Sequence, residues 1–203
     1  MERVGSATSK TKEVDIGVDI NLDVATEDTI IIVASNEAEP NFGADALSLF
    51  KHLLAQIFKH GKLGRGVGAN GDLPHHVVED LGIVFGQALK LALGDMKGIA
   101  RFASLSVPFE GSLASVAIDI SGRGYAVLDF QDMDDPTLAG MAQHFFEGMA
   151  INAGFNIYGK VETVGTLRND HHKLEAFCKA FGVCLHRATR VVGTDIPSTK
   201  GVL

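Results

Sequence analysis

The sequence repeats at an interval of nearly half its length, and this repeat constrains the fold more than any other feature. Three patterns recur in the same order at offsets of 96, 92 and 100 residues: His75-His76-x-x-Glu79 as His171-His172-x-x-Glu175, His52 as His144, and Val18-Asp19-Ile20 as Ile118-Asp119-Ile120. Offsets that agree this closely indicate one unit duplicated along the chain. We therefore predict two related half-domains.

Apolar periodicity predicts the elements of each half. Strands are expected over 12–23 and 29–34, and again over 101–105, 114–119, 125–130 and 154–164. Helices are expected over 45–60, 75–93, 138–152 and 171–191. Residues 1–10 are expected to be frayed, and 61–72 to form a flexible or edge-strand connection because glycines dominate it.

This order predicts an α+β fold, an internal duplication of a β-β-α-β-α-type half-domain of the ribosomal protein S5 domain 2-like class. Helices would pack on one face of each sheet. We expect one catalytic domain over residues 1–203, made of repeats at about 11–100 and 101–193, with a C-terminal tail over 194–203.

Charge and composition exclude several classes of function. A net charge of −7 argues against a nucleic-acid binder with a basic face. The N-terminal residues are polar, and the longest apolar runs are far too short to span a bilayer. Gly66 to Gly71 matches GxGxxG but follows a predicted helix, so we do not expect it to bind a nucleotide. With two cysteines that fit no disulfide framework, a cytoplasmic location is expected.

The repeated histidines and glutamates predict a metal site. In each His-His-x-x-Glu motif, the first histidine and the glutamate share one face of a helix, whereas the second histidine points about 100° away. One metal cannot easily use all three, so the spacing favours two metals that take ligands from more than one motif. Imidazole and carboxylate ligands without cysteine suit Mn, Fe, Co, Ni or Zn, and the pattern does not choose among them.

Four segments resemble the imidazoleglycerol-phosphate dehydratase family: HHVVED, SGR, RNDHHKLEAFCKA and PSTKGVL. The resemblance extends from about Thr11 to Leu203. It implies a hydro-lyase of histidine biosynthesis that converts imidazoleglycerol phosphate to imidazole acetol phosphate. It also implies two divalent ions, with Mn²⁺ expected, and a cytoplasmic homo-oligomer of 24 subunits with shared active sites. No nucleic-acid or membrane partner is implied.

The resemblance also implies a role for individual residues. The metal ligands would be His52, His75, His76, Glu79, His144, His171, His172 and Glu175. Glu13 would act as an acid or base, with Glu79 and Glu175 near the metals. Gln56 and His60 would contact the substrate, and its phosphate would bind Arg101, Arg123, Lys179, Ser198 and Lys200. The metals would serve as Lewis acids while the imidazole ring accepts electrons.

The chain departs from the family pattern mainly around its first half. Lys51 stands where the family has an acid, and the approach to His75 is shortened to Gly71-Asp72-Leu73-Pro74, without a usual aspartate. Glu110-Gly111 replaces two adjacent acids. Losses of this kind remove outer partners of the metal ligands and are expected to weaken the metal sites. Two alternatives remain: a catalytically impaired homologue that acts as a metal-stabilised assembly protein, or another di-metal enzyme on a phosphorylated substrate.

Overall fold

The computed structural model describes residues 2–25, 29–34 and 46–203. The first half contains β1 (Val4–Lys10), β2 (Val14–Asn21), β3 (Thr29–Ala34), α1 (Ala46–Gly61), β4 (Gly64–Gly71) and α2 (Pro74–Leu93). The second contains β5 (Phe102–Phe109), β6 (Ser112–Ile120), β7 (Tyr125–Asp129), α3 (Pro136–Ala153), β8 (Phe155–Thr163) and α4 (Asp170–Thr189). The predicted start of the first helix, at residue 45, lies outside the described residues.

The two halves have the same sheet topology, which confirms the predicted duplication and the α+β class. Their strand orders are β1-β2-β4-β3 and β5-β6-β8-β7. In each sheet the strand after the first helix, β4 or β8, pairs antiparallel with one neighbour and parallel with the other. Each described half has one strand more than the predicted β-β-α-β-α order.

Two local predictions were wrong. Val4–Lys10 is not frayed but forms β1, which pairs with β2 along its whole length. The glycine-rich segment is not a flexible or edge connection, because β4 lies between β2 and β3 inside its sheet. Its glycines permit close backbone approach: a Cβ at Gly66 would lie 2.2 Å from the carbonyl oxygen of Thr29. The strand pattern remains in Val67 and Ala69, which are both buried.

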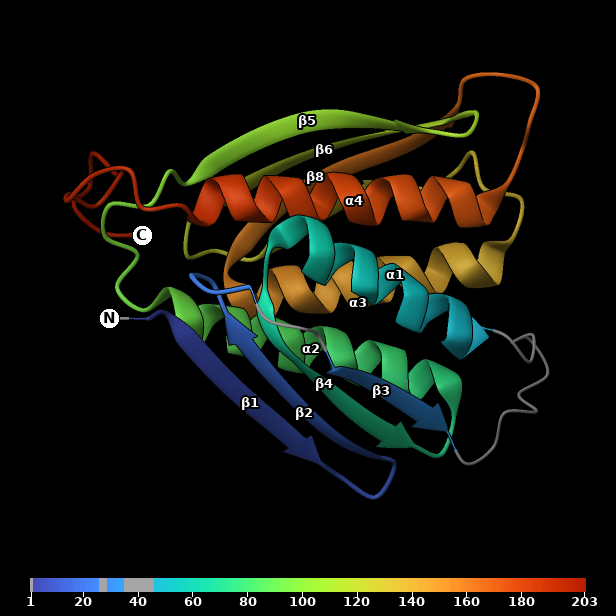
Figure 1. Cartoon of the computed structure of the whole chain (residues 1–203), viewed down its shortest axis with the longest axis horizontal. Helices are drawn as coiled ribbons and strands as arrows, with labels where there is room; N and C mark the ends of the chain where they lie inside the picture. The colour runs from blue at the N-terminus through green and yellow to red at the C-terminus, as the bar shows by residue number, and fades with distance from the viewer. Residues whose placement is uncertain (1, 26–28, 35–45) are drawn as a thin grey trace.

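The helices lie between the two sheets, which cover them from opposite sides (Figure 1). α2 packs on β1 and β2, α4 packs on β5 and β6, and the close helix pairs are α1 with α4 and α2 with α3. Alternate strand residues, such as Ile16 and Val18 on β2 and Val116 and Ile118 on β6, point inward and are buried. The core is therefore a helical layer with a sheet on either side.

None of the helices within the described ranges combines the length and apolar character that a membrane span requires.

Candidate functional site

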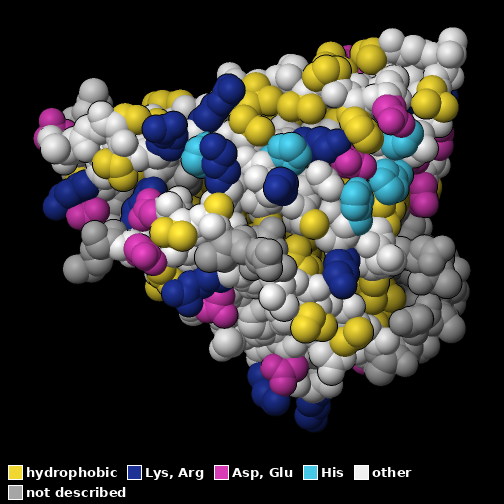
Figure 2. All heavy atoms as spheres, in the orientation of Figure 1, with side chains coloured by type: hydrophobic (Ala, Val, Ile, Leu, Met, Phe, Trp, Pro, Cys, Tyr) yellow, Lys and Arg dark blue, Asp and Glu magenta, His cyan; other side chains and the backbone are white. Residues whose placement is uncertain are grey.

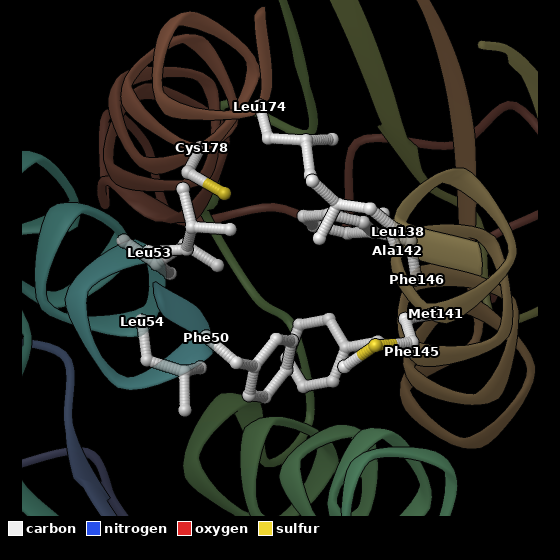
Figure 3. Close-up of a pocket in the computed structure, with 11 residues that line it drawn as sticks. Phe50, Leu53, Leu54, Leu138, Met141, Ala142, Phe145, Phe146, Leu174 and Cys178 are labelled. Atoms are coloured by element: carbon white, nitrogen blue, oxygen red, sulfur yellow. The ribbon is translucent and has the colours of Figure 1, made fainter. Parts of the chain in front are cut away.

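Apolar contacts among three helices determine where the histidines lie. Side chains from α1, α3 and α4 meet around a narrow gap, as Figure 3 shows. The volume of this gap is about 10 Å³. Phe50 and Leu53 of α1 bracket His52 in sequence, and Phe145 of α3 follows His144. Because these apolar faces are buried, the intervening histidines are directed to the rim. In Figure 2 histidine side chains gather at this end of the molecule, over the N-terminal ends of α1 and α4.

The first group of candidate ligands, which we call the α1–α4 cluster, consists of His52, His171 and Glu175. His52 Nε2 lies 3.2 Å and His171 Nε2 3.1 Å from Glu175 Oε2. The possible donor atoms of all three lie within 4.8 Å of one another. Two imidazole nitrogens and one carboxylate oxygen at this separation fit a divalent first-row metal.

The carboxylate of Glu175 is largely buried and ionised. Its side chain is only 10% exposed, and Lys179 Nζ lies 2.8 Å from Oε1. Burial raises the pKa of this carboxyl, but hydrogen bonds from Lys179, His52 and His171 outweigh that effect and lower the pKa to about 2. The carboxylate is therefore ionised at neutral pH.

The second group, which we call the α2–α3 cluster, consists of His75, Glu79 and His144. These residues line a pocket of about 180 Å³ between α2 and α3. His144 Nδ1 is hydrogen-bonded to Glu79 Oε1. Each cluster thus combines the first histidine and the glutamate of one half with the lone histidine of the other half. This exchange brings candidate ligands from different motifs together.

The second histidine of each motif lies beside a carboxylate that belongs to neither cluster. His76 Nδ1 lies 2.8 Å from Asp72 Oδ1. His172 Nε2 lies 3.3 Å from Glu110 Oε2, beside the ring of Phe109. We did not predict these partners from sequence. Asp72 was treated as the remnant of a shortened segment, although its place four residues before His76 favours this contact.

Glu13 lies beside the first-half motif. It is in the turn between β1 and β2, and its carbonyl oxygen accepts a hydrogen bond from the Asp72 backbone N–H at 2.9 Å. Its carboxylate is near Asp80, whose pKa is raised first by burial and then by the negative charges of Glu13 and Glu79. The structure therefore brings Glu13 toward the start of α2.

Gln56, His60 and Lys179 extend from the α1–α4 cluster along the same two helices. Gln56 Nε2 lies 3.4 Å from His52 Nε2. His60 is one helical turn further, and its pKa is lowered by burial and then by the positive charge of Lys179. A neutral His60 can accept or donate a hydrogen bond.

The remaining residues of the predicted phosphate set lie together at the other end of α4. Arg101, Arg123, Ser198 and Lys200 line an open pocket of about 540 Å³. Arg101 is fixed there, because Nε lies 2.7 Å from Asp119 Oδ1 and Nη1 lies 2.7 Å from the carbonyl oxygen of Pro197. Lys179 is not in this pocket, so the structure divides the predicted set into two places.

The distance between the two places is large. The Arg101 backbone N–H donates to the carbonyl oxygen of Ala188, thirteen residues after Glu175 on α4. At the rise of an α-helix this spacing corresponds to about 20 Å. Figure 1 shows the two ends of α4, with the C-terminal tail beside only one of them.

Comparison with known proteins gives consistent matches. The family model for imidazoleglycerol-phosphate dehydratase matches residues 46–185. The imidazoleglycerol-phosphate dehydratase of Methanosarcina mazei is 39% identical over 208 residues, covering 99% of this chain and 100% of the relative. That of Dehalococcoides mccartyi is 40% identical over 209 residues, covering 100% of this chain and 98% of the relative.

Solved structures agree with the sequence matches. The crystal structure of the Pyrococcus furiosus enzyme superposes with a TM-score of 0.77 at 29% identity, covering 97% of this chain and 99% of that one. The Staphylococcus aureus enzyme gives a TM-score of 0.67 at 27% identity, with 90% and 97% covered. The chain therefore belongs to the imidazoleglycerol-phosphate dehydratase family, hydro-lyases of histidine biosynthesis.

Proposed function

We propose that this chain dehydrates imidazoleglycerol phosphate to imidazole acetol phosphate with the help of two divalent metal ions, Mn²⁺ being the expected metal. The observation that carries the proposal is the pair of histidine–carboxylate clusters, α1–α4 and α2–α3, that the duplicated halves form by exchanging one histidine each. Their ligand types suit Mn²⁺ as well as its first-row neighbours.

In this proposal the two clusters bind the metals, and residues beside them transfer a proton and orient the substrate. His52, His171 and Glu175 would hold one metal, and His75, Glu79 and His144 the other. When bound, the metals supply Lewis acidity toward the imidazole ring of the substrate. Glu13, near the start of α2, would move a proton between carbon and oxygen, since a carboxylate can accept and return it. Gln56 and His60 would orient the substrate beside the α1–α4 cluster.

The phosphate pocket at the far end of α4 supports an active site shared between subunits. Imidazoleglycerol phosphate has only three carbons between its ring and its phosphate, so it cannot span the separation of about 20 Å along α4. We propose that the metal clusters of one copy face Arg101, Arg123, Ser198 and Lys200 of a second copy, with Lys179 joining them from the metal-bearing copy. Arginine, lysine and hydroxyl donors are suited to a phosphate monoester.

This arrangement requires a homo-oligomer, and we propose the 24-subunit assembly implied by the family resemblance, in the cytoplasm. His76 and His172, which lie beside Asp72 and Glu110 in their own chain, would complete the metal coordination of neighbouring copies. Each chain would be one catalytic domain of two repeats, with residues 194–203 as its phosphate-binding tail.

Metal removal tests the proposed chemistry. The protein is chelated exhaustively, dialysed and assayed for imidazole acetol phosphate, before and after Mn²⁺ is restored. We expect no turnover by the metal-free protein and recovery with Mn²⁺. Glu79→Gln should prevent recovery, whereas Glu162→Gln, a matched change of an exposed glutamate that is ion-paired with Lys160, should not. Full turnover by the metal-free protein would contradict the mechanism.

A further inference from the structure

Lys173 is a fully buried charge for which the proposed chemistry has no use. It lies between His172 and Leu174 in the first turn of α4, and its side chain is 0% exposed. Its ammonium group donates to the backbone carbonyl oxygen of Asp132 and to Asp170 Oδ1, the latter at 3.1 Å. A buried ammonium is tolerated only with such partners, so these contacts hold the side chain in one position.

Asp170 extends this network from α4 to α3. Its second oxygen, Oδ2, accepts hydrogen bonds from the backbone N–H groups of Asp134 and Asp135 at 2.8 and 2.7 Å. Asp135 in turn caps α3 by accepting from the backbone N–H groups of Thr137 and Leu138. Hydrogen bonds through Asp170 thereby connect the first turns of α3 and α4 to the buried ammonium group of Lys173. The first turn of α4 also contains His171.

The motif in the first half lacks this network. Val77 stands where the second motif has Lys173, and Pro74 stands where it has Asp170. The residue before α2, Leu73, makes no side-chain capping bond, whereas Asn169 caps α4 by accepting from the His172 backbone N–H. At the start of α2, Asp72 is hydrogen-bonded to the Leu73 backbone N–H and to His76, whereas Val77, in place of the lysine, has no charge with which to tie this turn to α3.

The two clusters also differ in how closely their possible donor atoms lie together and in how far their glutamates are buried. Among the residues that the structure describes, the α1–α4 cluster is the one whose possible donor atoms all lie within 4.8 Å. The Glu175 side chain is 10% exposed and that of Glu79 is 42% exposed, whereas the histidines differ less: His52 and His171 are 44% and 43% exposed and His144 is 56% exposed. Ligands that are already ordered lose less conformational entropy when a metal binds.

We propose that Lys173 is a positioning residue that preorders the α1–α4 cluster, so that this cluster binds its metal first and more tightly than the α2–α3 cluster. The inference rests on the proposed metal-binding function. It assigns the two metal sites different affinities and attributes the difference to a buried lysine that the twin motif lacks.

Metal titration tests the proposal without any assay of turnover. Metal-free protein is titrated with Mn²⁺, and free Mn²⁺ is followed by electron paramagnetic resonance. We expect two classes of site in the unsubstituted protein. His171→Ala should remove the tighter class, and His144→Ala the weaker one. Lys173→Met should weaken the tighter class about tenfold or more, the usual effect of losing an outer partner, and leave the weaker class unchanged.

Lys90→Met is the matched control, because it makes the same substitution at an exposed position of α2 and should change neither class. If Lys173→Met fails to fold, Asp170→Asn should give the same selective weakening. The proposal is overturned if His144→Ala removes the tighter class, if the two classes bind equally, or if a folded Lys173→Met weakens both or neither. Failure of the unsubstituted protein to bind any Mn²⁺ would instead refute the proposed function itself.

Discussion

Gly82 allows α2 and α3 to approach closely, and its replacement by alanine should disturb the α2–α3 cluster selectively. A Cβ at this position would lie 2.4 Å from the main-chain oxygen of Phe145, whereas ordinary contacts begin near 3.4 Å. The difference, 3.4 minus 2.4 Å, requires the helices to separate by about 1 Å, because a main-chain oxygen cannot rotate away. Overpacking of this kind typically costs about 1–3 kcal/mol.

The displacement should also reach the ligands. Phe145 follows His144, so moving α3 away from α2 should move His144 away from Glu79. We expect the melting temperature of Gly82→Ala to fall by roughly 2–4 °C for each kcal/mol lost. We also expect Mn²⁺ affinity to decrease at the α2–α3 cluster, with little change at the α1–α4 cluster.

Calorimetry and Mn²⁺ titration would measure both effects, with Gly140→Ala as the control for the melting temperature alone, because Gly140 also lines the pocket of the α2–α3 cluster. Gly140 lies on α3 with nothing within 4 Å of an added Cβ, so alanine there should be neutral or stabilising by up to about 1 kcal/mol. If Gly82→Ala melts at the same temperature as the unsubstituted protein and binds Mn²⁺ equally well at both clusters, the reasoning from this close approach is refuted.

Three further predictions follow from buried or charged groups. Glu175→Gln should lose about one metal per chain in metal analysis of the purified protein, and an unchanged content would contradict our assignment of this ligand. Burial raises the pKa of the Cys178 thiol above its usual range and that of Cys184 to about 11. At pH 8 both thiols should therefore react with a thiol reagent far more slowly in the native protein than in the urea-unfolded protein. Equal rates would show that the two thiols are accessible in the native protein. A hydrogen bond from the Thr163 hydroxyl is the main cause that lowers the pKa of Asp132 to about 2. The stabilisation from Asp132 is therefore present at neutral pH and lost as the pH falls from about 3.8 to 2, so urea midpoints should fall less steeply over this range in Asp132→Asn.

Much of the fold could be predicted from the sequence, because apolar spacing reports directly on buried faces. The stripes that predicted helices over 75–93 and 171–191 correspond to α2 and α4 within two residues at each end. The duplication was visible because the motifs that recur are unusual. β4 was missed as an interior strand because its strand pattern rests on Val67 and Ala69 alone, with Gly68 between them and further glycines on either side. β1 was missed because of its polar residues, of which Ser6, Thr8 and Lys10 lie on one side of an edge strand.

Spacing in the sequence predicted which candidate residues share a helix face, but not how the residues group across helices. Spacing along a helix predicts that His171 and Glu175 share a face, and they do. No local pattern shows that His52 belongs with the second motif and His144 with the first, since that exchange results from how α1, α3 and α4 pack. The separation of Lys179 from Arg101 could not be predicted either, because it depends on the length and direction of α4. Lys173 gave no signal, since a lysine among polar neighbours at a helix start is usually exposed.

The most direct test of a shared active site is complementation between two inactive variants. Glu175→Gln removes a proposed metal ligand, and Lys200→Met removes a proposed phosphate donor at the opposite end of α4. If the two chains are unfolded together in equal amounts and reassembled, random mixing leaves about one quarter of the shared sites with both parts intact. We predict that the mixture recovers about a quarter of the unsubstituted activity, although each variant reassembled alone remains inactive. If the mixture stays as inactive as its components, one chain supplies both parts, and the account of a site shared between copies is wrong.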